Sequence, residues 1–290
     1  MARSAASPTV LRWYIALELG ALRQRSGRTQ KQVAERLECS PAHVGHFETG
    51  HSLPSRSELE VLLDFYQVGE RIPSFGELLA SARTGRDWWE PFKGAVPGWF
   101  DLFLGLESSA TQIESYDAQV IPGLFQTPAY TEAVMRAERP EPAESEITHR
   151  IELRQARQEV LVRHPDPPAV WSILDEPTLY GLAGKPKVMR EQLQHLAKLS
   201  ELPNVTILVL PMDTRPHAGS NGNGTFVILS FPHLDGAPAV AYTDGMVQGS
   251  YYTDPAAVLR YRNALTQLHN LALDPEESRA RILRRIEESS

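Results

Sequence analysis

The sequence is poor in cysteine and in long hydrophobic runs. With a single cysteine, Cys39, the chain cannot form an internal disulfide, and no cysteines and histidines are paired at the spacing of a zinc site. The longest apolar segment, residues 205–210, is far shorter than the roughly 20 residues of a membrane-spanning helix, and the N-terminus has no charged-then-apolar signal pattern. These absences predict a cytoplasmic protein with no membrane association and no bound metal.

The sequence also lacks the motifs of several enzyme classes. It contains no Walker-type phosphate loop, no dinucleotide-binding glycine fingerprint and no G-x-S-x-G nucleophile elbow. One polar region gathers the residue types of triads and metal sites, but its histidines lack the short helical spacing of zinc ligands. These residues are Asp213, His217, Ser220, His233 and Asp235. We predict structural or solvated roles for them, with no catalysis and no cofactor.

Asp175 and Glu176 lie side by side at the end of a predicted strand. Neighbouring residues of a strand point to opposite faces of the sheet, so these two carboxylates are poorly placed to share a substrate. We expect one of them to cap the helix that begins at Pro177.

The net charge of −7 is distributed unevenly along the 290 residues. Residues 1–83 contain ten Lys and Arg against nine Asp and Glu, which leaves 19 of the 29 basic and 27 of the 36 acidic residues for residues 84–290. Within residues 1–36, seven basic residues stand against two acidic ones. The length allows two domains, and this split predicts an N-terminal domain with a basic face for phosphates and an acidic C-terminal domain.

Residues 1–83 show helix signals in close succession. Apolar residues at helical spacing indicate a first helix, which Gly27 ends. Thr29 opens a second helix with the capping box T-Q-K-Q, and Ser40 opens a third as the N-cap before Pro41. The third helix is predicted to extend to about Thr49.

Two further capping boxes, at residues 55–58 and 74–77, predict the starts of a fourth and a fifth helix. Leucines follow each box at positions suited to a buried helix face: Leu59, Leu62 and Leu63 in the fourth helix, and Leu78 and Leu79 in the fifth. Five short helices predict a compact bundle.

The second and third helices, joined by a tight turn, carry the functional signal. This arrangement allows one helix to cross the DNA backbone while the next lies in the major groove. Val44 and Phe47 are spaced to pack the third helix against the second, which leaves Ala42, His43 and His46 facing outward. The pair therefore predicts a helix-turn-helix that binds DNA; a helical bundle that binds another protein is the alternative.

The motifs T-Q-x-x-x-A at residues 29–34, V-G-x-F-E-T-G at 44–50 and P-S at 54–55 resemble the phage-repressor and Xre-type helix-turn-helix family. The resemblance covers residues 12 to about 68. It implies a lambda-repressor-like all-α fold for the N-terminal domain.

The same resemblance implies roles for individual residues. Gln30 matches the family residue that grips the phosphate edge, while Pro41, Ala42 and His46 match residues that approach base edges. Pro41 departs from the family, which often places a polar side chain there, so more of the readout must fall to its neighbours.

A histidine can donate to a guanine acceptor or accept from a base amine, so His43 and His46 are our candidates for base contact, with a merely solvated role as the alternative. Lys31, Arg28 and Arg56 suit phosphate, which positions the protein without specifying sequence. The complete set of expected DNA-binding residues is Gln30, Lys31, Ser40, Pro41, Ala42, His43, His46, Thr49, Arg28 and Arg56.

Residues 84–110 are predicted to be an aromatic connector. A polar break at 83–86 precedes aromatic residues spread among prolines and glycines: Trp88, Trp89, Trp99 and Phe100. These aromatics either form an interdomain or dimer surface or fill the start of the second core.

Residues 111–290 are predicted to form an α+β regulatory or partner-binding domain. Strands are expected at 113–120, 170–174, 205–210, 225–231, 239–243 and 247–252, and helices from 128, at 145–163, around 189–196, at 256–271 and at 275–288. Residues 170–210 read as one strand, helix, strand crossover, and N-G-N-G at 221–224 as a hairpin turn. The fold class expected for the chain is multidomain, an all-α helix-turn-helix domain plus an α+β domain.

The C-terminal half contains four motifs, P-G-L-x-Q-T-x-x-Y at 122–130, R-x-x-x-R-Q at 150–155, D-E at 175–176 and M-x-x-Q-L at 189–193. With the helix-turn-helix they resemble the antitoxin-like, WhiJ-type regulators of actinomycetes over nearly the whole chain. The resemblance implies a regulator frequently encoded beside a small partner protein. Glu152 lies one position earlier than the glutamate that these regulators often place, where this chain has Leu153.

These observations predict a homodimeric, sequence-specific transcriptional regulator of double-stranded DNA, acting as a repressor, whose C-terminal domain responds to a small protein or ligand. One alternative is an antitoxin-like module that neutralises a small partner, with DNA binding as autoregulation. Another is a small-molecule sensor with a pocket between the strands and the charged helix.

Overall fold

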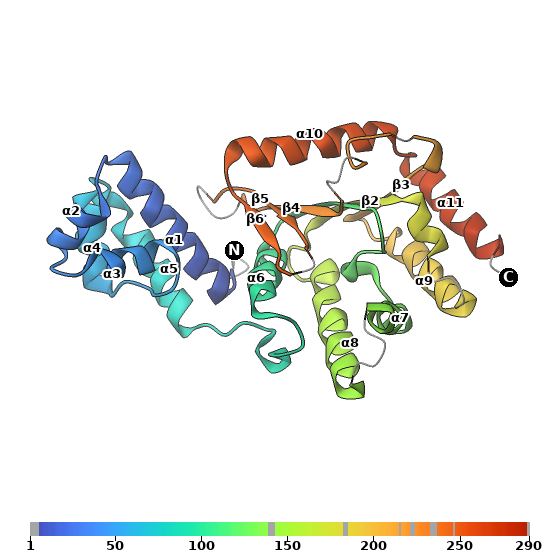
Figure 1. Cartoon of the computed structure of the whole chain (residues 1–290), viewed down its shortest axis with the longest axis horizontal. Helices are drawn as coiled ribbons and strands as arrows, with labels where there is room; N and C mark the ends of the chain where they lie inside the picture. Colours follow the sequence, from blue (N-terminus) through green and yellow to red (C-terminus); the bar gives the residue numbers. More distant parts are fainter. Residues whose placement is uncertain are drawn as a thin grey trace. The chain divides into compact units, whose positions relative to one another are not determined.

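The computed structural model divides the chain into two compact units between Glu90 and Pro91. Figure 1 follows the chain from the N-terminal to the C-terminal unit. Of the range expected as a connector, residues 84–90 belong to the N-terminal unit and residues 91–110 to the C-terminal unit. The structure describes residues 6–138, 143–181, 185–214, 216–220, 224–232, 237–245 and 247–288.

The N-terminal unit is a bundle of short helices around an apolar core. The helices are α1 (Pro8–Arg25), α2 (Gln30–Arg36), α3 (Pro41–Glu48), α4 (Arg56–Phe65), the 3-10 turn η1 (Gly69–Arg71) and α5 (Ile72–Thr84). Ile15, Val33, Val44 and Leu63 are among its fully buried side chains. Gly27, with φ of +67°, ends the first helical region in the left-handed conformation that the sequence predicts.

The caps of the helix-turn-helix are as predicted. Thr29 and Ser55 form reciprocal capping boxes, and the Ser40 hydroxyl accepts from the amide of His43 at 3.2 Å. The box predicted at 74–77 is wrong, because α5 already begins at Ile72. Ser74 lies inside that helix, and its hydroxyl donates to the carbonyl of Arg71.

The C-terminal unit is built on a mixed sheet, whose strands among the described residues run in the order β3-β2-β1-β4-β5-β6. β1, β2 and β3 are parallel, and β4, β5 and β6 continue the sheet antiparallel. The strands are β1 (Gln112–Asp117), β2 (Ala169–Asp175), β3 (Val205–Leu210), β4 (Phe226–Ser230), β5 (Val240–Thr243) and β6 (Ser250–Tyr252).

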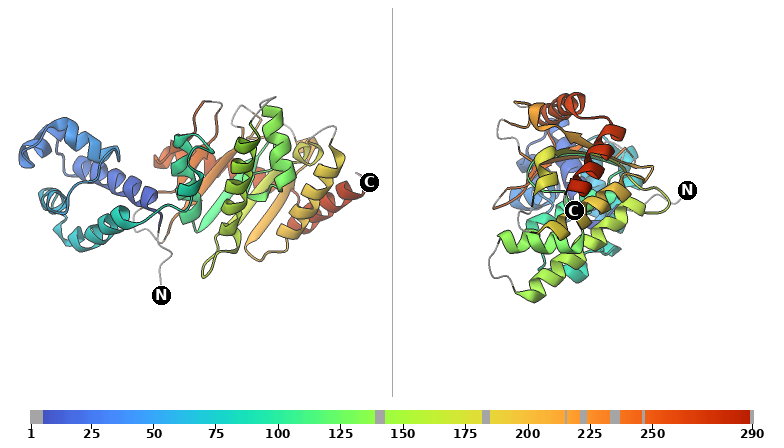
Figure 2. Two further views of the ribbon diagram at one scale, coloured as in Figure 1. Left: turned by 90° about the horizontal axis from the view of Figure 1, so that it is seen from below. Right: turned by 90° about the vertical axis from the view of Figure 1, so that its right-hand side faces the viewer.

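Helices cover both faces of this sheet (Figures 1 and 2). α10 lies on one face, against the side chains of Tyr116, Ile173 and Phe226, while α6, α7, α8 and α9 lie on the other. The α-helices of this unit are α6 (Asp101–Ser109), α7 (Pro128–Glu138), α8 (Glu144–Gln158), α9 (Pro186–Leu199), α10 (Pro255–Leu271) and α11 (Pro275–Glu288). The 3-10 turns are η2 (Glu90–Phe92), η3 (Gly98–Phe100), η4 (Gly123–Phe125), η5 (Glu159–Val162), η6 (Glu176–Tyr180) and η7 (Met212–Thr214).

The fold class expected from the sequence is confirmed: an all-α helix-turn-helix region precedes an α+β domain. β2, α9 and β3 form the predicted crossover, with Val170 paired to Val205 in parallel register. The charged helix is shorter than predicted, since α8 ends at Gln158 and continues as a 3-10 turn. Most of the hairpin turn predicted at 221–224, and two residues of the polar cluster, His233 and Asp235, lie outside the described residues.

Candidate nucleic-acid interface

Helix α3 presents one face to the core and the other to solvent. Val44 and Phe47 are 1% and 2% exposed, respectively, and pack α3 into the bundle as their spacing predicts. The opposite face carries residues that the sequence singled out, all exposed: Pro41, Ala42, His46 and Thr49. The Ser40 hydroxyl oxygen, by contrast, is used in capping the helix.

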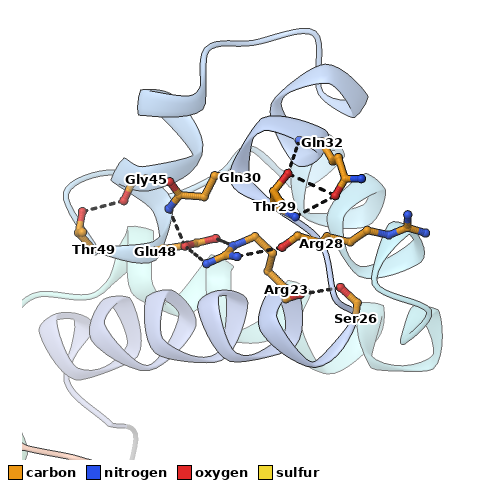
Figure 3. A network of polar contacts seen from close by, with 9 residues as sticks. All are labelled: Arg23, Ser26, Arg28, Thr29, Gln30, Gln32, Gly45, Glu48 and Thr49. Atoms are coloured by element: carbon orange, nitrogen blue, oxygen red, sulfur yellow. Dashed lines mark hydrogen bonds and ion pairs between the residues drawn. The ribbon is translucent and has the colours of Figure 1, made fainter.

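A polar network joins α1, α2 and α3 (Figure 3). The Arg23 guanidinium donates to both carboxylate oxygens of Glu48, at 2.6 Å from Nε and 3.0 Å from Nη2. Gln30 Nε2 donates to the same carboxylate at 2.9 Å, and Arg23 Nη1 donates to the carbonyl of Arg28 at 2.9 Å. The hydrogen bond to Glu48 raises the pKa of Arg23, so this guanidinium is charged at any physiological pH.

This network holds α3 in a fixed orientation relative to α1 and α2. Gln30, expected to grip phosphate, has its amide nitrogen occupied by Glu48, so in this structure it orients α3. Arg23 and Glu48 are not among the DNA-binding residues expected from the sequence. Glu48 lies inside the family-like V-G-x-F-E-T-G motif, which was the available signal; Arg23 had none beyond its charge.

His43 and His46 have different surroundings. His43 is half-buried, with Nε2 3.2 Å from a carboxylate oxygen of Glu58 and its ring edge-on to Phe47. Burial alone would raise the pKa of Glu58, but hydrogen bonds from Ser55 and His43 outweigh it and lower that pKa. His43 therefore links α3 to α4, whereas His46 is exposed.

His46 lies beside a second histidine, His51, which is not among the DNA-binding residues expected from the sequence. The ring of His51, just beyond α3, lies with its centroid 4.9 Å from that of His46, and both side chains are exposed. The bend at residues 50–52 brings the two rings together, and the amide of Ser52 donates to the carbonyl of His46 at 3.2 Å. This histidine pair lies at the C-terminal end of the exposed face of α3.

The cations expected to meet phosphate are placed as follows. Lys31 is exposed on α2, and Arg56 is exposed at the start of α4, where it pairs with Glu60 at 3.1 Å. Arg28 is half-buried, with its guanidinium 4.6 Å from the ring centroid of Phe65. Lys31 is thus the least constrained of the three.

The motifs of the C-terminal unit, far apart in sequence, meet at residues 121–127. Gln126 accepts from Arg154 Nη1 and donates to the carbonyl of Ile121 at 2.7 Å. Gln192 accepts from the amide of Thr127 at 2.7 Å and donates to the carbonyl of Phe125. Three of the four motifs of the C-terminal half therefore form one loop and the side chains that hold it in place.

Two residues of the polar cluster, His217 and Ser220, hydrogen-bond to nearby backbone, whereas Asp213 is exposed. Ser220 Oγ accepts from the amide of His217 at 3.1 Å, and His217 Nδ1 accepts from the amide of Gly219 at 3.1 Å. The prediction that Asp175 or Glu176 caps the next helix is wrong, because η6 has no side-chain cap. Long-range partners take both carboxylates instead: Asp175 accepts from Tyr116, and Glu176 accepts from Arg281 and from the amide of Met212.

Two family models match the chain. The model described as a domain of unknown function, DUF5753, matches residues 100–284, and the model described as a helix-turn-helix domain matches residues 15–72. No curated protein and no solved structure matches. Among the described residues, no helix has both the length and the apolar character to span a membrane, and no group of three or more His, Cys, Asp or Glu side chains is arranged to bind a metal.

Proposed function

The chain belongs to the family defined by the DUF5753 domain, with a helix-turn-helix domain before it, and from this premise we propose that it is a sequence-specific transcriptional regulator. The helix-turn-helix domain makes double-stranded DNA its partner. In the proposal α3 lies in the major groove and α2 crosses the phosphate backbone. A protein with this role acts where the DNA is, which for the actinomycete regulators that it resembles is the cytoplasm.

The observation that carries this proposal is the contrast between the two faces of α3. Its inner face is held by Val44 and Phe47, and its angle by the half-buried Arg23–Glu48 pair. Its outer face combines small or rigid residues at the N-terminal end with the histidine pair near the C-terminal end. A helix braced in this way can enter a groove without losing its orientation to the bundle.

Two groups of side chains divide the work in the proposal. His46, with His51 beside it, reads base edges, and Ala42 and Pro41 provide close apolar contact. Lys31, Arg28 and Arg56 neutralise phosphates and supply affinity that does not depend on sequence. The contact of His43 with Glu58 supports a bracing role for this histidine in addition to base contact.

We propose further that the regulator is a homodimeric repressor that reads two half-sites about one helical turn, roughly 34 Å, apart. The N-terminal 83 residues carry ten basic and nine acidic residues, so one copy offers few net charges to the DNA. The acidic C-terminal unit would control the DNA-competent state through a small protein partner or a ligand that binds its two states with different affinity. We propose no catalytic role.

The test is a selection of bound genomic fragments with the purified full chain at two salt concentrations. Recovery of a near-palindromic motif, with affinity that falls as salt rises, is the expected result. Failure to recover any motif at either salt concentration would favour the antitoxin-like alternative, in which protein binding comes first; co-purification of a small protein encoded nearby would then identify that partner.

Substitutions distinguish side chains that recognise bases from side chains that bind phosphates. His46→Ala should lose discrimination at one base position while binding to random DNA persists, whereas Lys31→Ala should weaken binding to all sequences and lower the salt slope by about one. The controls are His149→Ala and Lys187→Ala, which replace exposed residues of the same types in the C-terminal unit. Equal losses on specific and random DNA from His46→Ala would remove it as a reader.

A further inference from the structure

The C-terminal unit contains a cavity of about 200 Å³ between the sheet and the helices on its α8 side. Its floor is formed by strands β1, β4 and β5, and its walls by α6, α8 and the loop at residues 121–126. Phe100, Phe103 and Tyr242 give the cavity an aromatic side. The same space also contains ionisable groups, which a purely structural core would avoid.

Arg154 differs from the arginines one turn before it and one turn after it on α8, and it lines the cavity together with Arg157. Arg157, one turn further on, pairs with both carboxylate oxygens of Glu107, at 2.8 and 2.9 Å, and Arg150, one turn before, pairs with Glu146 at 3.0 Å. Arg154 donates to the neutral amide oxygen of Gln126 and has no carboxylate partner among the described residues.

The surroundings of Arg154 are unfavourable to its charge. Burial, together with the neighbouring charges of Arg157 and Arg150, lowers its pKa to about 10. The charge of Glu138 opposes these effects only in part. A guanidinium has five N–H donors, and a buried cation without a hydrogen-bonded carboxylate costs stability. An anion in the cavity that accepted hydrogen bonds from the Arg154 guanidinium would offset this cost.

A second polar group lies on the cavity floor. Asp117, 3% exposed, accepts at one oxygen, Oδ2, from Ser115 at 2.7 Å and from Ser172 at 3.2 Å. Its other oxygen, Oδ1, accepts no hydrogen bond from any described residue. A ligand that donates a hydrogen bond would satisfy it.

The loop that closes the cavity is held in place before any ligand arrives. Gln126 and Gln192 bind its backbone, and Gln158 Nε2 donates to the carbonyl of Gln126 at 2.7 Å. At Gly123 an added Cβ would lie 3.0 Å from Arg157 Nη1, so this glycine allows the loop to pack directly on the buried ion pair. Pre-organisation of this kind favours binding because little entropy is lost.

We propose that this cavity is a binding site for a small organic oxyanion, a carboxylate or a phosphate monoester, which pairs with Arg154 and donates a hydrogen bond to Asp117 from its far end. The aromatic side of the cavity accommodates a planar or apolar body between these two groups. As the effector site of a regulator, the cavity rests on the proposed function; as a binding site, it stands without DNA.

The test uses three probes of defined chemistry on the full chain: 4-aminobenzoate, 4-aminophenyl phosphate and the neutral 4-aminobenzamide. One or both aminated anions should raise the unfolding temperature with increasing concentration, and the better of the two identifies carboxylate or phosphate as the preferred head group. 4-Aminobenzamide should produce no shift. The absence of a shift with both aminated anions at 10 mM, or an equal shift with the neutral amide, would overturn the proposal.

Variants locate the binding. Arg154→Met should weaken binding of the preferred probe by about tenfold or more, because a charged hydrogen-bonding partner is lost. Arg154→Lys, which keeps the charge but not the fork, should give an intermediate affinity and carries the test if the methionine variant does not fold. Arg260→Met, an exposed arginine on α10, is the matched control. Unchanged binding by both Arg154 variants would place the probe elsewhere and overturn the proposal.

A DNA-binding measurement then separates this inference from the regulatory one. If the preferred probe binds through Arg154 and alters DNA affinity, both stand. If it binds through Arg154 but leaves DNA affinity unchanged, the site stands and its effector role fails.

Discussion

The buried carboxyl of Asp117 should make the stability of the protein depend on pH. Burial raises the pKa of Asp117 from its ordinary value of 3.8 to about 7, although hydrogen bonds from Ser115 and Ser172 act to lower it. Below pH 4 the group is protonated in both the folded and the unfolded chain, and above pH 7 it is ionised in both. Between these limits only the unfolded chain loses the proton, so its contribution to stability falls as pH rises.

The magnitude follows from the size of the shift. A difference of one pKa unit corresponds to about 1.4 kcal/mol, so a shift from 3.8 to about 7 corresponds to about 4 kcal/mol across the whole window. Asp117→Asn replaces the carboxyl with an amide of nearly the same shape that does not titrate. The free energy of unfolding of the wild type minus that of the variant should therefore fall by about 1.4 kcal/mol per pH unit between pH 4 and 7.

Urea unfolding of both proteins at pH 4.5, 5.5, 6.5 and 7.5 measures this difference. Ser172→Ala removes one hydrogen bond that favours the ionised form, so it should extend the window to higher pH. A constant difference between wild type and Asp117→Asn across this range would show that the cavity floor is well solvated and would refute the reasoning.

Two further predictions concern packing at single positions. Glu48→Ala leaves the half-buried Arg23 without its carboxylate and should cost about 2 kcal/mol in the unfolding free energy, with weaker binding to specific DNA, measured by thermal unfolding and by titration with the selected site. Gly219→Ala would place a Cβ 2.3 Å from a ring carbon of Tyr116 and should lower the free energy of unfolding by about 1–3 kcal/mol. Gly76→Ala, with no atom within 4 Å of the added Cβ, is the control and should not destabilise the protein. Equal effects of the two substitutions would contradict the packing argument.

The charged cavity and the braced helix-turn-helix are built from different kinds of interaction. At α3, local caps set the ends of the helix, and one ion pair between α1 and α3 sets its direction. At the cavity, Arg154 comes from α8 and Asp117 from β1, so neither acquires its environment until the sheet and α8 pack together. The first arrangement suits recognition of a regular surface such as DNA, and the second suits a small molecule.

Much of the helix-turn-helix could be predicted from the sequence, because its signals are local. The hydroxyls of Thr29, Ser40 and Ser55 accept from amides three residues further on, and Gly27 ends its helical region through its own backbone conformation. The capping box predicted at 74–77 is not formed. The same residue pattern lies within a helix that begins earlier, at Ile72 and Pro73, and a capping hydroxyl requires a free amide that an interior position does not offer.

The sequence by itself determined the ends of α2 and α3, the start of α4 and the exposed face of α3, since these depend on contacts a few residues apart. Only the tertiary structure decided which side chains meet: Arg23 with Glu48, His43 with Glu58, and Arg154 with Gln126. These pairs are separated by 25, 15 and 28 residues, respectively, and no periodicity or cap encodes such a distance. They form because packing of the apolar faces brings the polar groups together, and burial then gives Arg154 and Asp117 the properties that their residue types alone do not have.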